Sequence, residues 1–114
     1  MPIIELEVIV NAEIGIAPSE KGRVQQLAIA VSAEIDPEAV SKASTVGEIG
    51  HTLDYGLLRS IIHEVFEGKR FKLLEEPAIL IKQQINDLPR VKQVRVRIAK
   101  ARPWADVPSV SLTV

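Results

Sequence analysis

The 114-residue chain is 46% hydrophobic, which predicts one compact domain over residues 1–114 and leaves no room for a second core. It carries 14 basic and 15 acidic residues, so its net charge of −1 does not direct it to nucleic acid or to a membrane surface. It contains no cysteine, which excludes disulfides and thiolate sites and fits a cytoplasmic protein, and no apolar run approaches the roughly 20 residues of a membrane span.

Two alternating patterns open the chain and predict a long antiparallel pair of strands. Apolar residues occupy every second position in residues 4–10 and again in residues 27–35. This spacing is typical of strands that bury one face. The residues between them, 11–22, contain two glycines and a proline and predict a loop. That loop places Glu20 just before the second strand.

The middle of the chain predicts helical structure that begins and ends at recognisable residues. Residues 37–44 predict only a short helical turn, followed by an irregular stretch. Asp54 is suited to cap a helix whose apolar stripe runs from Leu58 to Phe66 and which stops at Gly68. This assignment places Tyr55, the residue after the cap, in the first turn of that helix.

A second helix is predicted from the apolar residues that recur at three-and-four spacing between Leu74 and Leu88. Pro77 fits only within the first turn of this helix, so the helix starts close to Glu75. The free backbone N–H groups and the helix dipole there favour an ionised carboxylate, which could accept two parallel N–H bonds from a flat, amide-like ligand. The alternative is that Glu75 merely stabilises the helix start.

Two further alternating segments, residues 94–98 and 110–114, predict a third and a fourth strand. The order β-β-α-α-β-β predicts an α+β fold, in which a four-stranded antiparallel sheet carries both helices on one face. The other face is then polar, and it is either exposed to solvent or lines a tunnel in an oligomer. It would carry Glu5, Glu7, Ser32, Glu34, Arg95, Arg97, Ser109 and Ser111.

Lys100 has the parity of the apolar residues 94–98, so its side chain is expected to lean toward the helices at the end of the third strand. A lysine at such a position is a candidate for chemistry. The alternative is a side chain that lays its aliphatic stem on apolar surface and keeps its ammonium in water.

Four motifs together resemble the dihydroneopterin aldolases of folate biosynthesis, in order and spacing, over nearly the whole chain. They are Gly15 with Glu20 and Gln25, then Thr52-Leu53-Asp54-Tyr55, then Leu73-Leu74-Glu75, and finally Lys100 before Pro103. The resemblance implies the tunnelling fold, in which subunits join edge to edge into a barrel lined by the polar sheet face. It also implies a homo-oligomer, a tetrameric ring or an octamer of two stacked rings, with active sites between subunits.

The resemblance further implies roles for individual residues. Glu75 would accept the 2-amino and N3 hydrogens of a pterin, with Leu73 and Leu74 beside it and with Thr52 and Leu53 forming part of the pterin slot. Catalysis would fall to Lys100, to Tyr55 as a phenol that handles a proton, and to Glu20 as a loop acid close to the lysine and across a subunit boundary from Glu75.

The implied reaction is the retro-aldol cleavage of 7,8-dihydroneopterin into 6-hydroxymethyl-7,8-dihydropterin and glycolaldehyde. The C=N bond of the pterin ring accepts the electron pair, so neither a Schiff base nor a metal is needed, and acid–base transfer completes the reaction. The chain departs from many aldolases at residues 12–15 and at His51. Its segment 102–107 also resembles epimerases of dihydroneopterin triphosphate, which are the first alternative.

No cofactor is indicated, and no metal site either, because His51 and His63 lack a third ligand at sensible spacing and are read as surface histidines. Residues 90–102 hold six basic side chains and no acid, which would suit a phosphate or nucleic-acid strip. Strand parity divides those side chains between two faces, and few aromatics accompany them, so we expect neither a nucleic-acid nor a membrane partner. A catalytically silent oligomeric or pterin-binding paralogue is the remaining alternative.

Overall fold

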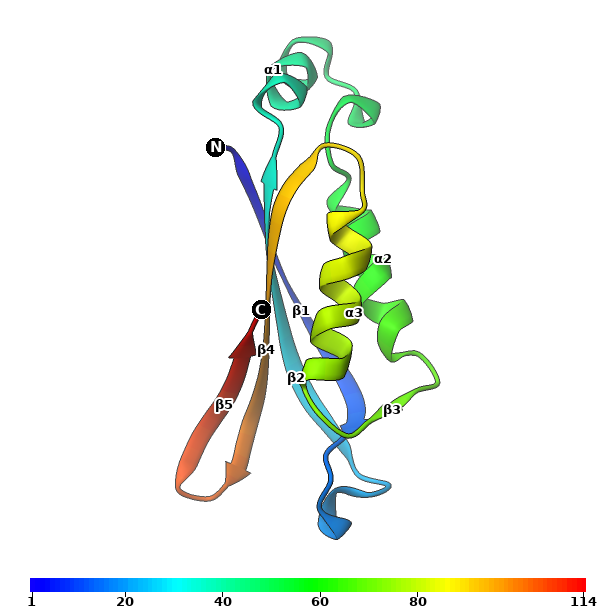
Figure 1. Cartoon of the computed structure of the whole chain (residues 1–114), viewed down its shortest axis with the longest axis vertical. Coiled ribbons are helices and arrows are strands. Elements are labelled where there is room, and N and C mark those ends of the chain that lie inside the picture. Colours follow the sequence, from blue (N-terminus) through cyan, green and yellow to red (C-terminus); the bar gives the residue numbers. More distant parts are fainter.

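A computed structural model describes all residues, Met1–Val114, and its elements follow one another from a strand pair through helices to a second strand pair (Figure 1). The strands are β1 (Ile3–Ile14), β2 (Val24–Ile35), β3 (Arg70–Phe71), β4 (Val91–Trp104) and β5 (Val107–Thr113). The α-helices are α1 (Pro37–Val46), α2 (Tyr55–Phe66) and α3 (Glu75–Asn86), and single 3₁₀ turns occur at Pro18–Glu20 and Ile49–His51.

The strands form one sheet in the order β3-β1-β2-β4-β5. All neighbours are antiparallel except β3, which pairs in parallel with the end of β1. The predicted α+β class is therefore confirmed, with five strands where four were predicted. The additional strand escaped prediction because two residues are too few to show any periodicity.

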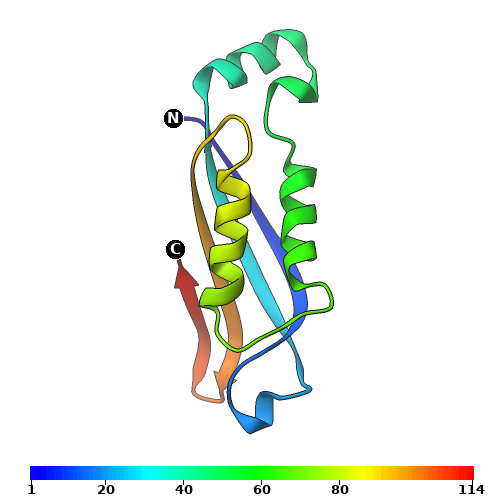
Figure 2. The same ribbon diagram turned by 45° about the vertical axis from the view of Figure 1, so that its right-hand side comes forward.

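Helices α2 and α3 lie side by side on one face of the sheet, as predicted (Figures 1 and 2). Their apolar stripes bury Leu58 and Ile62 from α2 and Ile81 and Ile85 from α3 against the inward residues of the strands. Each such side chain contributes roughly 1.5–3 kcal/mol by leaving water. The core thus fixes both ends of each helix against the sheet, and with them the residues at the helix starts.

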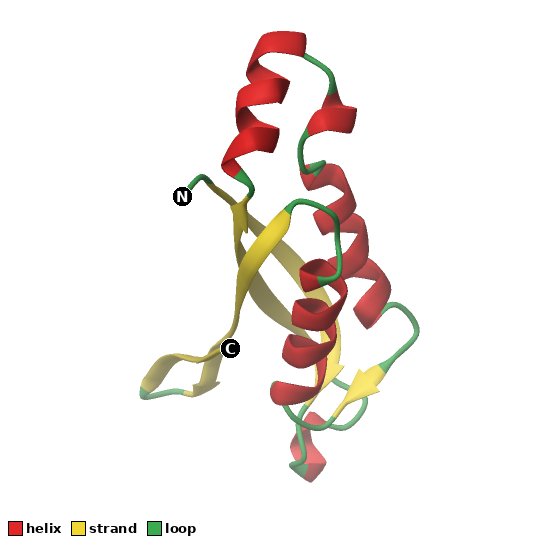
Figure 3. Cartoon of the chain, turned by 45° about the horizontal axis from the view of Figure 1, so that its top comes forward, coloured by secondary structure: helices red, strands yellow, loops and turns green.

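Helix α1 is a full helix of 10 residues, where only a short turn was predicted. Asp36 caps it by accepting a hydrogen bond from the backbone N–H of Glu38 at 3.0 Å, Pro37 occupies its first position, and Gly47 ends it with φ of +75°. It buries none of its residues and projects beyond the end of the sheet (Figure 3). The absence of a buried face explains why the apolar pattern alone understated it.

The first strand is also longer than predicted, because residues 11–14 continue it instead of opening the loop. Ala12 and Ile14 are buried, and Glu13 pairs with Val24 of β2 and with Arg70 of β3. The loop to β2 is therefore short, and it begins at Gly15.

The face of the sheet that the helices leave open is polar and mixed in charge, as predicted. Glu5 and Glu7 on β1 face Arg95 and Arg97 on β4 across β2, where Ser32 lies between. A concavity of about 530 Å³ runs along this face. No helix of the structure is long and apolar enough to cross a membrane.

Candidate functional site

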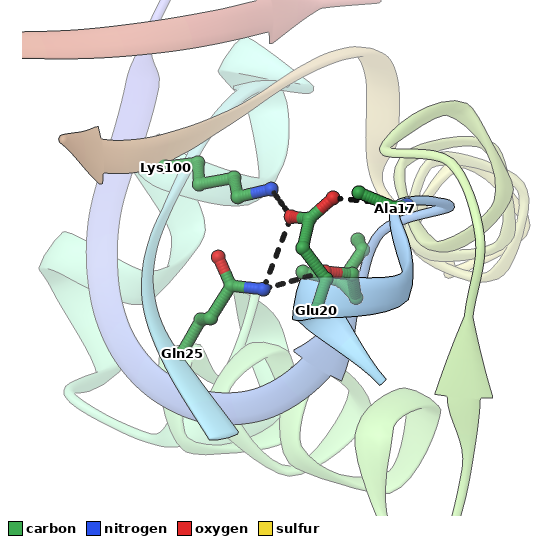
Figure 4. A network of polar contacts seen from close by, with 5 residues as sticks. Ala17, Glu20, Gln25 and Lys100 are labelled. Carbon is green, nitrogen blue, oxygen red and sulfur yellow. Dashed lines mark hydrogen bonds and ion pairs between the residues drawn. The ribbon is translucent and has the colours of Figure 1, made fainter. Parts of the chain in front are cut away.

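An ion pair joins two side chains that lie 80 residues apart in the sequence (Figure 4). Lys100 is paired with Leu27 in the β2–β4 register, which puts its side chain on the helix side of the sheet, as parity predicted. Its Nζ donates a hydrogen bond to Oε2 of Glu20. The two side chains are only 12% and 19% exposed, so the pair is largely withdrawn from water. A shielded ion pair of this kind is held more firmly than one on an open surface.

The carboxylate of Glu20 is held from several directions. The backbone N–H of Ala17 donates to its Oε1 at 3.4 Å, and Nε2 of Gln25 donates to its Oε2 at 3.3 Å. The same amide also donates to the backbone oxygen of Ile14 at 2.6 Å, which joins the start of β2 to the end of β1 across the base of the loop. The hydrogen bond from Lys100 is the main cause that lowers the pKa of Glu20. Glu20 is therefore an ionised carboxylate with a fixed position.

Gly15 leaves the space that this carboxylate occupies. Its φ is +135°, a conformation that residues with a side chain rarely adopt, and a Cβ added there would collide with the carboxyl atoms of Glu20. The Gly-x4-Glu-x4-Gln spacing thus has a physical reason: the glycine makes room for the acid, and the glutamine holds it. Residue patterns alone gave no role to Gln25, although its spacing from Glu20 was the available signal.

Two neighbouring acids at the start of α3 have different surroundings. Glu76 accepts hydrogen bonds from the backbone N–H groups of Lys72 and Leu73 at 2.8 and 2.9 Å, and these bonds lower its pKa. Glu75, the first residue of α3, is exposed and has no hydrogen bond or ion pair to its side chain. Glu76 therefore stabilises the start of α3, the role that was the alternative for Glu75. The carboxylate of Glu75 remains free for a ligand.

The start of α3 and the Lys100–Glu20 pair lie at the same end of the sheet. The backbone N–H of Gly15 donates to the backbone oxygen of Phe71 at 3.1 Å, four residues before Glu75. The loop that carries Glu20 is thereby joined to the segment that leads into α3. Glu20 and Glu75 of one chain therefore lie at the same end of the sheet, and the expected subunit boundary between them stays a prediction.

The Thr52–Tyr55 segment lies at the other end of the helix layer. Asp54 caps α2 as predicted, accepting a hydrogen bond from the N–H of Gly56 at 2.8 Å, and Tyr55 is the first residue of the helix. The 12 residues of α2 span about 18 Å, so Tyr55 is separated by that length from the end where α3 begins. Its side chain is 64% exposed, whereas Leu53 belongs to the core. One chain therefore does not bring Tyr55 to Lys100.

The two histidines lie in different elements. His51 approaches Glu48 at 3.7 Å in the turn before α2, and His63 lies in the last turn of α2. No group of three or more potential metal ligands occurs in the structure.

Comparison with known proteins identifies the family. A family model described as "FolB: Dihydroneopterin aldolase" matches residues 4–114. Dihydroneopterin aldolase from Escherichia coli, solved with neopterin, superposes with a TM-score of 0.90 at 23% identity, covering 100% of this chain and 97% of that one. A FolB protein from Vibrio cholerae gives 0.88 at 23% identity, covering 100% and 95%.

A third structure, dihydroneopterin aldolase from Burkholderia bound to guanine, gives a TM-score of 0.81 at 18% identity and covers 98% of this chain and 88% of that one. A search of curated proteins found no match. These superpositions confirm the tunnelling fold for the chain, while its closure into a barrel stays a prediction. Because the family model spans nearly every residue, the chain belongs to the dihydroneopterin aldolase family.

Proposed function

We propose that the protein cleaves 7,8-dihydroneopterin by a retro-aldol reaction to 6-hydroxymethyl-7,8-dihydropterin and glycolaldehyde, with residues 1–114 forming one catalytic domain. The observation that carries this proposal is the shielded Lys100–Glu20 pair at the same end of the sheet as the free carboxylate of Glu75. An acid–base pair next to an unpaired acceptor suits a substrate that must be both anchored and deprotonated.

Glu75 anchors the pterin in this proposal. A pterin and a guanine share one edge, a ring N–H beside an exocyclic amino group, and a carboxylate can accept both hydrogens in parallel. The relatives from Escherichia coli and Burkholderia were solved with neopterin and with guanine, which fits a site that reads this edge. Leu73, half-exposed beside the helix start, and the backbone of Leu74 complete the anchor.

Lys100 and Glu20 handle the proton in this proposal. Cleavage of the C1′–C2′ bond releases an electron pair into the C=N bond of the ring, while the 2′-hydroxyl loses its proton and becomes the aldehyde. Lys100, or a water that it holds, takes that proton, and C1′ is then protonated by an acid for which Tyr55 is the candidate. The ion pair with Glu20 holds Nζ of Lys100 in a fixed position, from which it can orient the water that takes the proton.

A second chain supplies Tyr55, Thr52 and the backbone of Leu53 to this site. The separation along α2 is the supporting observation, because these residues cannot reach Lys100 of their own chain. The outer edge of β1 is paired only at its last two residues, and the outer edge of β5 is unpaired, so the sheet has two edges to join. Edge-to-edge joining into a ring, as a tetramer or a stacked octamer, would pair the free sheet edges and would supply Tyr55 from a second chain.

Epimerisation at C2′ is the second candidate, because re-addition of the aldehyde after the same cleavage would invert that carbon with the same acid–base pair. The experiment is to incubate the purified protein separately with dihydroneopterin and with its triphosphate and to identify the products. Release of glycolaldehyde and hydroxymethyldihydropterin is expected. A C2′ epimer without cleavage would make the protein an epimerase, and no turnover with tight pterin binding would make it a silent paralogue.

A further inference from the structure

A cleft of about 260 Å³ opens beside the Lys100–Glu20 pair, on the side of the β4–β5 hairpin. Its lining includes Ser19, Glu20, Arg23, Lys100, Arg102 and Trp104. The volume is below that of most sites for drug-sized ligands and suits a small polar group attached to a larger molecule. The cleft therefore accommodates a substituent next to the reacting atoms.

The charges in this cleft do not balance. Glu20 is its only acid and is already paired with Lys100, so two cationic side chains, Arg23 and Arg102, remain. Neither arginine has an ion pair or a side-chain hydrogen bond within the chain, whereas Arg70 is paired with Glu13. Two uncompensated guanidinium groups that line one small cleft attract an anion there.

The backbone holds these arginines at the ends of two adjacent strands. Arg23 directly precedes β2, and Arg102 follows Lys100 by two residues in β4, which pairs with β2. The β4–β5 register shifts between Ala101 and Trp104, and Arg102 adopts a left-handed φ of +45° at this irregularity. Such bulges re-aim a side chain and recur near functional sites.

We propose that Arg23 and Arg102 form an anion subsite that receives a phosphate ester on the side chain of the dihydropterin substrate. The inference rests on the proposed function, since it places the phosphate on the substrate that Glu75 anchors and Lys100 deprotonates. Guanidinium groups bind phosphate oxygens by two parallel hydrogen bonds, which favours arginine over lysine for this role.

The same cleavage then gives a phosphorylated product. The C1′–C2′ bond breaks, the 2′-hydroxyl loses its proton, the electron pair enters the ring, and C1′ gains a proton. The ester stays on C3′, so the aldehyde leaves as glycolaldehyde phosphate and no further reactant is consumed. The two arginines would hold the leaving fragment as well as the substrate.

The test compares the binding of neopterin and neopterin 3′-phosphate, which are not cleaved, by titration calorimetry to wild type, Arg23→Ala and Arg102→Ala. Each substitution is expected to weaken binding of the phosphate ester by about 10- to 100-fold and to leave neopterin binding within about twofold. Arg90→Ala is the matched control, because Arg90 is also exposed and also has a positive φ, +71°. Arg102→Lys should restore part of the affinity.

Each result has one meaning. A preference of wild type for the phosphate ester that both alanine variants lose, and that the control keeps, supports the subsite. Equal binding of the two compounds, or equal weakening of both in the arginine variants, overturns the subsite and leaves the proposed aldolase intact. A wild type that binds neither compound refutes the proposed function, and the subsite is refuted with it.

Discussion

Replacing Gly15 by alanine tests whether this glycine exists to make room for the carboxylate of Glu20. The added Cβ would meet the Glu20 carboxyl group, and φ of +135° would strain any residue with a side chain. Such strain costs about 1–3 kcal/mol. Displacing the carboxylate also breaks its bond with Lys100, and a hydrogen bond to a charged group contributes about 1.5–3 kcal/mol when it is shielded from solvent.

We therefore expect Gly15→Ala to lower the free energy of unfolding by about 3–5 kcal/mol. Gly22→Ala is the matched control, because Gly22 has a φ of +71° but nothing within 4 Å of an added Cβ. It should cost only the backbone strain, about 1–2 kcal/mol. The assay is urea unfolding of all variants at one protein concentration, because oligomerisation would make stability depend on concentration.

A double-mutant cycle separates collision from strain. In a Glu20→Ala background the carboxylate is absent, so Gly15→Ala should cost only the backbone strain, about 1–3 kcal/mol. Equal costs of Gly15→Ala in the presence and in the absence of the Glu20 carboxylate would refute the reasoning. The glycine would then serve the backbone alone.

Three further predictions address the site. Glu75→Gln should weaken neopterin binding by about 10- to 100-fold in calorimetry, because the amide presents a donor to the N–H pair of the ligand; unchanged affinity would remove Glu75 as the anchor. Lys100→Ala should keep neopterin affinity but lower glycolaldehyde release by about 10²–10⁴-fold. Full activity of Lys100→Arg would show that Lys100 acts only as a fixed charge, and the proton transfer would then be assigned to Tyr55 or water. Because Lys100 holds the pKa of Glu20 below its ordinary value of 4.5, the pair stabilises the fold above that pH and loses its effect as the pH falls through the lowered pKa. In urea titrations between about pH 6 and pH 3, wild type should therefore lose more stability than Glu20→Gln, and parallel losses would contradict this linkage.

Local patterns predicted the parts of the fold that bury one face. The alternation in residues 27–35 and the stripe from Leu58 to Phe66 each correspond to a buried surface in the structure. Helix α1 and the two-residue strand β3 were understated or missed, because the first buries no residue and the second is too short to repeat. Hydrophobic periodicity thus predicts elements that bury one face and does not detect elements that bury few residues.

Local sequence predicted the position of single site residues but not the contacts between them. The Asp54 cap and the helix start at Glu75 follow from local sequence, and strand parity placed Lys100 on the helix side. The contact between Lys100 and Glu20 joins residues 80 positions apart, which no local pattern contains. The hydrogen bond from Gln25 in β2 to the backbone of Ile14 in β1 is likewise a contact that only the structure shows.

The strand order has a consequence for folding. β1 and β2 adjoin in sequence and can pair as a local hairpin, but β4 takes its place beside β2 only after all three α-helices and β3 have been synthesised. Closing so long a loop costs entropy before any contact repays it, so this pairing forms late and slows folding. Because Lys100 arrives with β4, a nascent chain carries Glu20 without its cation until synthesis is nearly complete. The Lys100–Glu20 pair therefore forms late, in the same step that joins β4 to β2.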